Sequence, residues 1–162
     1  MSNFLIDYTT YMRSLAAQHR ELNHTAEEKH FFRGELQEFW QQFRSDVRFP
    51  CLIAESCDMK YTGEKGRLFK ERSTSFIVAD KYDQHDDYDE IQLKMSKCER
   101  IAEEILAKII SEDDAFIASR MDEGTGQYLM NEADRYVGYR MDFKIIEQVC
   151  VNLSTAFSNE EN

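Results

Sequence analysis

The sequence predicts an α+β fold, in which an N-terminal helical pair precedes a four-stranded, mostly antiparallel sheet covered by one long helix, in the order α-α-β-β-α-β-β. Three observations predict it. Apolar residues recur at spacings of three and four over residues 3–22, 25–46 and 88–109, as in amphipathic helices. Short apolar or alternating runs, typical of strands, lie between and after the last two segments. Because these strands come in runs, they favour an antiparallel or mixed sheet.

The length of 162 residues with 42% hydrophobic residues predicts one domain over residues 1–162. Within it we expect a helical pair at 1–49, a sheet core at 50–153 and a frayed polar tail at 154–162. The net charge of -11 argues against direct nucleic-acid binding. No apolar run approaches the roughly 18 residues that a membrane span needs. The N-terminus also has no signal-peptide pattern, so we expect a cytoplasmic protein or part of an assembled particle.

The first helix is expected over residues 3–22. Thr25 and Glu28 then form the S/T-x-x-E pattern of a capping box, which predicts that a second helix begins there. It is expected to run to Asp46 and to end before Pro50, the single proline. Aromatic residues gather on this helix, and subunit interfaces are enriched in them, so they are candidates for an interface or for the core. These residues are Phe31, Phe32, Phe39, Trp40 and Phe43.

The sheet core begins with two expected strands at residues 51–55 and 73–81, joined by a polar segment that we interpret as a mobile hairpin loop. The long third helix follows at 88–109, and a short helix is expected at 111–117. The remaining strands, 127–131 and 136–151, are expected to form a closing hairpin after a turn made by Gly124, Thr125 and Gly126, with a bulge at Ile145 and Ile146.

Charge is distributed unevenly along the chain. Residues 1–49 contain seven acidic and six basic residues, whereas residues 80–90 contain six acidic residues and one basic one. The loop at 58–72 is a candidate partner-binding loop because of its five basic residues, Lys60, Lys65, Arg67, Lys70 and Arg72. The segment after the second strand is a candidate acidic docking face, which contains Asp83, Asp86, Asp87 and Asp89.

No motif in the sequence indicates catalysis. The four cysteines form no Cys-x-x-Cys pair, and we expect them to be buried thiols in a reducing compartment. Glycine-rich phosphate loops and a nucleophile elbow are both missing. The pattern Asp58-Met59-Lys60 resembles the acid-x-Lys end of a metal-dependent nuclease, but the acidic composition argues against the basic groove such an enzyme needs. We therefore expect no catalytic residues, no metal ligands, no cofactor and no enzymatic activity.

Three stretches carry a resemblance to a known family: HTAEEKHFFR at 24–33, FIVAD at 76–80 and VGYRMDF at 137–143. Together with the order of the expected elements, they resemble the small α+β tail terminator or completion proteins that cap the tubes of phage tails and contractile injection systems. The resemblance covers most of the chain as architecture. It implies a structural protein that forms a homo-oligomeric ring, a hexamer, on a tube end, with tube, sheath or neck proteins as partners.

A second interpretation is left open by the charge pattern. The chain could be an acidic cytosolic adaptor or inhibitor that binds a basic partner through residues 80–90.

Overall fold

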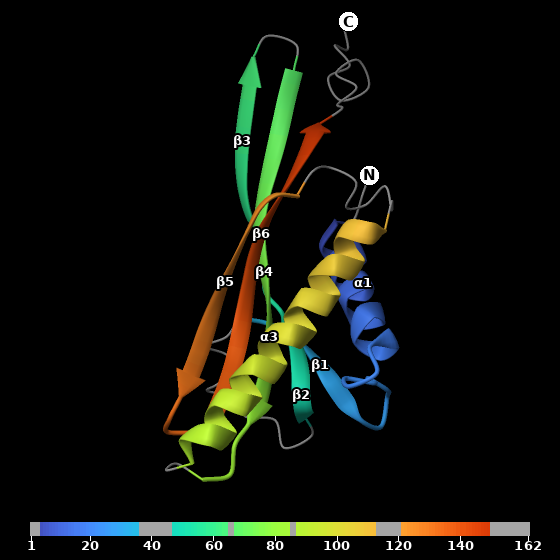
Figure 1. Ribbon diagram of the computed structural model, residues 1–162. Coiled ribbons are helices and arrows are strands. Elements are labelled where there is room, and N and C mark those ends of the chain that lie inside the picture. The colour runs from blue at the N-terminus through green and yellow to red at the C-terminus, as the bar shows by residue number, and fades with distance from the viewer. Residues whose placement is uncertain (1–3, 36–46, 65–66, 85–86, 113–120, 150–162) are drawn as a thin grey trace, which may run out of the picture.

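The computed structural model describes residues 4–35, 47–64, 67–84, 87–112 and 121–149 (Figure 1). The architecture is α+β, but the predicted four-stranded sheet behind a helical pair is wrong. The described residues form two helices and a mixed sheet of six strands. The elements are α1 (Phe4–Gln18), β1 (Lys29–Arg33), β2 (Val47–Ala54), β3 (Asp58–Glu64), β4 (Arg67–Lys81), α3 (Tyr88–Ser111), β5 (Met121–Asn131) and β6 (Tyr136–Val149).

The long strand β4 organises the sheet. The strand order is β1-β2-β4-β6-β5, and β3 pairs with β4 outside this path. On one edge of β4, residues 67–73 pair with β3 and residues 76–79 pair with β2. On its other edge β6 runs alongside residues 68–81. All of these pairs are antiparallel except β1 with β2, which is parallel.

The predicted second helix is wrong where the structure describes it, because residues 29–33 form strand β1. The capping-box hydrogen bond from the Glu28 amide to Thr25 Oγ1 is present at 2.9 Å. However, the Thr25 amide also donates to the Glu28 carbonyl at 2.9 Å, which closes a turn instead of opening a helix. The rest of the expected helix, with Phe39, Trp40 and Phe43, lies outside the described residues.

Pro50 lies inside β2 and does not precede a strand as expected. The Phe49–Pro50 peptide bond is cis. A proline has no amide to donate to a ladder. Its position agrees with the pairing on both sides: the ladder with β4 begins at Cys51, and the ladder with β1 is irregular between the Lys29–Val47 and Phe31–Leu52 pairs.

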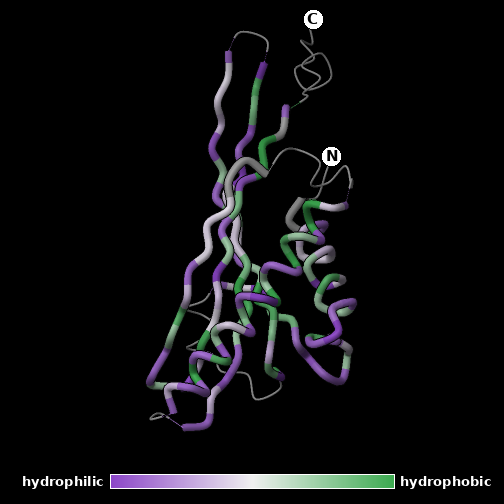
Figure 2. Tube along the Cα trace, viewed as in Figure 1, coloured by the Kyte–Doolittle hydropathy of each residue, from purple (hydrophilic) through white to green (hydrophobic). Residues whose placement is uncertain are grey.

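The two helices cover one face of the sheet (Figure 1). The prediction of α3 is confirmed, since residues at helical spacing are buried against β4 and β6, and hydrophobic and hydrophilic residues alternate along it (Figure 2). The first predicted helix corresponds to α1, whose Tyr8, Met12 and Leu15 are also buried. This core, together with the alternating residues of β4 and β6, contains most of the buried apolar side chains among the described residues.

The opposite face of the sheet has its own apolar cluster, which includes Cys51, Ile53 and Ile77. Phe31 and Phe32 point to opposite faces of β1, and each is 8% exposed. These two aromatic residues therefore belong to the core of the chain. Of the predicted aromatic interface, the described part is buried within this protein.

The closing hairpin is confirmed, but the turn expected before it is wrong. Gly124, Thr125 and Gly126 lie within β5, paired with residues 141–143 of β6. A Cβ at Gly126 would collide with the Tyr139 side chain, so glycine allows this ring to lie across the strand. The bulge also differs from the prediction, because the extra residue lies on β5 between Met121 and Gly124.

We predict that Ile101→Ala will lower the free energy of unfolding by about 2 to 5 kcal/mol, because it removes fully buried methyl groups of α3 and leaves a cavity. Leu93→Ala on the same helix is the matched control, since Leu93 is exposed and should change stability by about 0.5 kcal/mol or less. Chemical denaturation measures both. Equal effects of the two substitutions would contradict the packing described for α3.

The turn between α1 and β1 predicts a pH dependence. His24 Nδ1 accepts a hydrogen bond from the His30 amide at 3.1 Å, and burial, followed by the nearby Arg13 and His30, lowers the pKa of His24. A lowered pKa in the folded state means that the unfolded chain binds the proton more tightly. The contribution to stability is complete above the unfolded pKa of about 6.5 and is lost as the pH falls through the folded pKa.

The loss of stability between pH 7.5 and pH 5 should therefore be smaller in His24→Gln than in the wild type. Thermal or chemical unfolding at the two pH values measures this difference. The same pH dependence in both proteins would show that His24 does not contribute to it.

Candidate functional site

An arm extends from the sheet. It consists of β3 and residues 67–73 of β4, with residues 144–149 of β6 paired along the other edge of β4, and Figure 1 shows it reaching beyond the helices. Seven residues in β conformation span roughly 23 Å. All seven residues of β3 are exposed, and in the described part of the chain β3 pairs with a strand on one side only. The arm thus presents an open strand edge of a kind that can accept another strand.

The predicted basic loop is this arm, so the interpretation of residues 58–72 as a loop is wrong for the described residues. Two of its basic side chains brace the arm internally. Lys70 Nζ lies 5.3 Å from the centre of the Tyr61 ring, and buried Arg72 contacts Met59 Sδ at 3.4 Å. Lys60 and Arg67 are exposed.

Lys65, the fifth predicted basic residue, is outside the described residues. The arm also exposes two large apolar side chains on its open strand: Met59 is 49% exposed and Tyr61 is 54% exposed.

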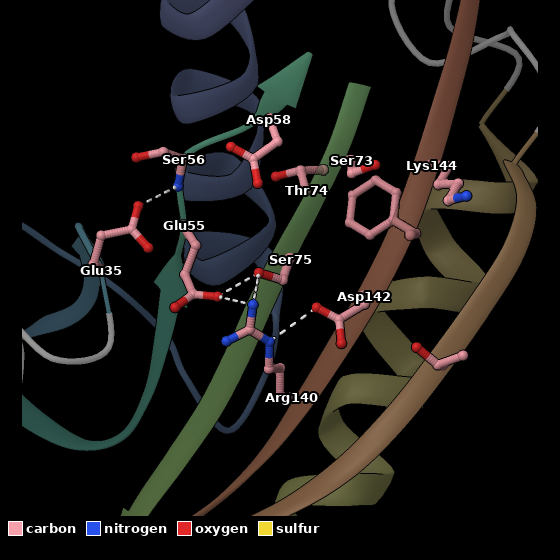
Figure 3. Close-up of a pocket in the computed structure, with 12 residues that line it drawn as sticks. Glu35, Glu55, Ser56, Asp58, Ser73, Thr74, Ser75, Arg140, Asp142 and Lys144 are labelled. Carbon is pink, nitrogen blue, oxygen red and sulfur yellow. Dashed lines mark hydrogen bonds and ion pairs between the residues drawn. The ribbon is translucent and has the colours of Figure 1, made fainter. Parts of the chain in front are cut away.

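A polar pocket of about 390 Å³ lies at the base of the arm, where β2 ends and β3 begins (Figure 3). Glu55 is 4% exposed there, and its Oε2 lies 3.0 Å from a terminal nitrogen of Arg140 on β6. The Ser75 hydroxyl donates to the same carboxylate oxygen and accepts from Arg140 at 3.1 Å. Arg140 Nε also donates to Asp142 at 2.9 Å. Buried Glu55 is therefore both paired and hydrogen-bonded.

The electrostatics of the pocket keep Arg140 charged. Burial opposes the charged form, but the hydrogen bond with Asp142 and the charges of Glu55 and Asp142 outweigh it and raise the pKa of Arg140. The network connects the end of β2 to β6 across β4. Its position makes it a structural anchor for the arm.

The pocket is lined mainly by carboxylates and hydroxyls, together with an arginine and a lysine. The Ser75 hydroxyl is bonded to the Glu55 carboxylate, and no histidine lines the pocket among the described residues. Asp58 lines the same pocket, whereas Lys60 does not. In the ranges that the structure describes, no group of three or more His, Cys, Asp or Glu residues could hold a metal ion.

The acidic face lies at the other end of the molecule, at the start of α3. Asp83, Asp87 and Asp89 are exposed, and Asp87 caps the helix by accepting from the Glu90 amide. Hydrogen bonds from Tyr82 and Arg135 hold this segment against the β5–β6 turn, which adds the exposed residues Glu132 and Asp134.

One described acid of the 80–90 segment does not contribute to an exposed acidic face. Asp80 is 2% exposed, and its carboxylate lies 3.4 Å from Lys94 Nζ and 3.5 Å from Lys97 Nζ. It therefore joins β4 to α3. Asp86 is outside the described residues.

No family model matches the chain, and no curated protein matches it. Among the helices of the described residues, none is long and apolar enough to cross a bilayer. Cys51 and Cys98 are buried free thiols, as expected, whereas Cys57 is partly exposed and Cys150 is outside the described residues.

The network of Glu55, Ser75 and Arg140 was missed from the sequence. The alternation of Arg140, Asp142 and Lys144 indicates a polar strand face, and Glu55 directly follows a buried apolar run. These signals could have suggested a buried acid and a polar face. They do not show that positions 55, 75 and 140 meet.

We predict that Arg140→Gln will lower the free energy of unfolding by about 3 kcal/mol, because it leaves the buried Glu55 carboxylate without its countercharge. Lys144→Gln is the control on the same strand face, since its contact with Glu71 at 3.4 Å is partly exposed and worth about 1 kcal/mol or less.

The double variant Glu55→Gln/Arg140→Gln should recover part of the loss, because it removes the unpaired charge. Denaturant unfolding measures all three proteins. An Arg140→Gln effect no larger than that of Lys144→Gln would contradict the role assigned to this ion pair.

Proposed function

We propose that this protein is a non-enzymatic assembly subunit that joins its neighbours through the β3–β4 arm. The observation that carries the proposal is the arm itself, an exposed strand of seven residues that extends beyond the helices. Natural proteins normally shorten, cover or block such edges because they pair with other chains. An edge left long and open is therefore suited to binding another chain by strand addition or by its side chains.

The charges at the two ends of the molecule support contact between copies. Residues 58–72 contain five basic and three acidic residues in a chain of net charge -11. The acidic end, defined as Asp83, Asp87, Asp89, Glu132 and Asp134, lies at the opposite end of the sheet from the arm (Figure 1). Opposite charges at opposite ends favour a head-to-tail contact, which closes into a ring when the rotation between copies allows it.

The resemblance to tail terminator proteins extends this proposal. A ring of such subunits, a hexamer, would cap a tube, and the arm would contact the tube or a neighbouring subunit. Exposed Met59 and Tyr61 add apolar area to the basic arm, as expected of a surface that binds another protein.

The charge-reversal variant Lys60→Glu/Arg67→Glu tests the proposal. It should raise the protein concentration required for half-maximal assembly by about tenfold or more, because it places negative charge where an acidic surface should dock. Mass photometry and light scattering across a concentration series measure this shift, and added salt should weaken wild-type assembly.

Arg20→Glu/Arg48→Glu is the matched control, because it reverses two exposed charges outside the arm. It should assemble like the wild type. A wild type that stays monomeric at every concentration, or an arm variant that assembles normally, would overturn the proposal.

The acidic adaptor is the alternative, and the acidic end favours it because two separate segments contribute exposed carboxylates there. Asp83→Asn/Asp87→Asn/Asp89→Asn tests it, since asparagine at position 87 can still cap the helix. If the protein is an adaptor, it is a monomer that binds a basic partner. The triple asparagine variant should then no longer bind that partner, whereas Lys60→Glu/Arg67→Glu should still bind it.

A further inference from the structure

A second cationic surface lies between α1 and β1, away from the arm. A groove of about 790 Å³ runs there, and Arg13, Lys29 and Arg33 are exposed along it. Among the described residues, the lining includes His24 but no aspartate or glutamate. In a chain with 31 acidic and 20 basic residues, a lining without any acid stands out. The groove therefore suits a negatively charged ligand.

The cations surround an aromatic floor. The Arg13 guanidinium lies 5.5 Å from the centre of the Phe31 ring, and the His24 ring lies 6.0 Å from it. Phe31 and Arg33 are two residues apart on the regular part of β1, so both side chains point to the face that α1 covers. A ligand in the groove would contact an apolar surface as well as two guanidinium groups, which bind carboxylates in bidentate fashion.

The positive field of the groove also has an effect on its histidine. Burial lowers the pKa of His24, and the charge of Arg13 lowers it further. A bound anion would reduce the repulsion from Arg13. The groove can therefore accept negative charge from a bound ligand.

The neighbouring strand indicates an extended ligand. β1 is the end strand of the described sheet, and among the described residues no strand pairs with it on the side away from β2. An added strand would use the backbone groups of that edge and would place alternate side chains over Phe31 and the cations. A simple anion would use only the cations.

We infer that the α1–β1 groove binds an extended acidic peptide segment of a partner protein, with its carboxylates on Arg13 and Arg33. The site is separate from the arm, so it does not depend on the proposed function. The contact resembles strand addition in which charge provides the selectivity.

Fluorescence anisotropy tests this with the full chain and a labelled Glu-Thr-Glu-Thr-Glu-Thr-Glu peptide. The same peptide with Gln in place of Glu is the ligand control. The wild type should bind the acidic peptide at least tenfold more tightly than the neutral one. Arg13→Gln/Arg33→Gln should lose at least tenfold in affinity, and Arg33→Gln alone should lose part of it without removing the contact of Arg13 with Phe31.

Arg20→Gln is the control variant, because Arg20 is an exposed arginine close in sequence that does not line the groove. It should bind like the wild type. The inference is overturned if neither peptide binds, if both bind equally, or if the groove variants bind like Arg20→Gln. Displacement of the acidic peptide by an equal concentration of inorganic phosphate would also overturn it, since that result indicates a simple anion site.

Discussion

The hydrogen-bonded ion pair between Glu55 and Arg140 is the interaction on which the rest of the structure depends. Ser75 stands at its centre: its carbonyl accepts from the Glu55 amide at 3.1 Å and from Tyr8 at 3.3 Å, while its hydroxyl bridges the ion pair. One residue of β4 therefore contacts α1, β2 and β6. This junction lies where two successive strands share an edge of β4, so it anchors the arm to the body of the protein.

An anchored arm has different properties from a mobile loop. A loop loses conformational freedom when it binds, and that loss weakens the complex. Here Tyr61 with Lys70 and Met59 with Arg72 hold β3 on β4 before any partner arrives. Although the net charge is -11, charged residues are placed unevenly and form three distinct surfaces: a basic arm, an acidic end and a cationic groove.

The sequence predicted elements whose patterns are long and local. Helix α3 and the pairing of β5 with β6 follow from periodicity alone. The prediction of a helix start at Thr25 and Glu28 failed, because the same hydrogen bond occurs both at helix starts and in tight turns. The parallel pairing of the following residues with β2 determines that a turn and a strand form here. It also failed at Gly124 and Gly126, which lie within β5; at Gly126 the neighbouring Tyr139 ring requires a glycine. The site at Glu55 was out of reach because its partners are separated by 20 and 85 positions.

The central claim is that the open edge of β3 is where this protein meets its neighbours. Hydrogen–deuterium exchange of the backbone amides of β3, measured over a range of protein concentrations, tests it most directly. If the edge pairs or is covered on assembly, the outward-pointing amides of β3 will exchange more slowly as concentration rises, while amides of the turn near exposed Arg20, after α1, change less. Exchange in β3 that stays the same at every concentration would contradict the claim.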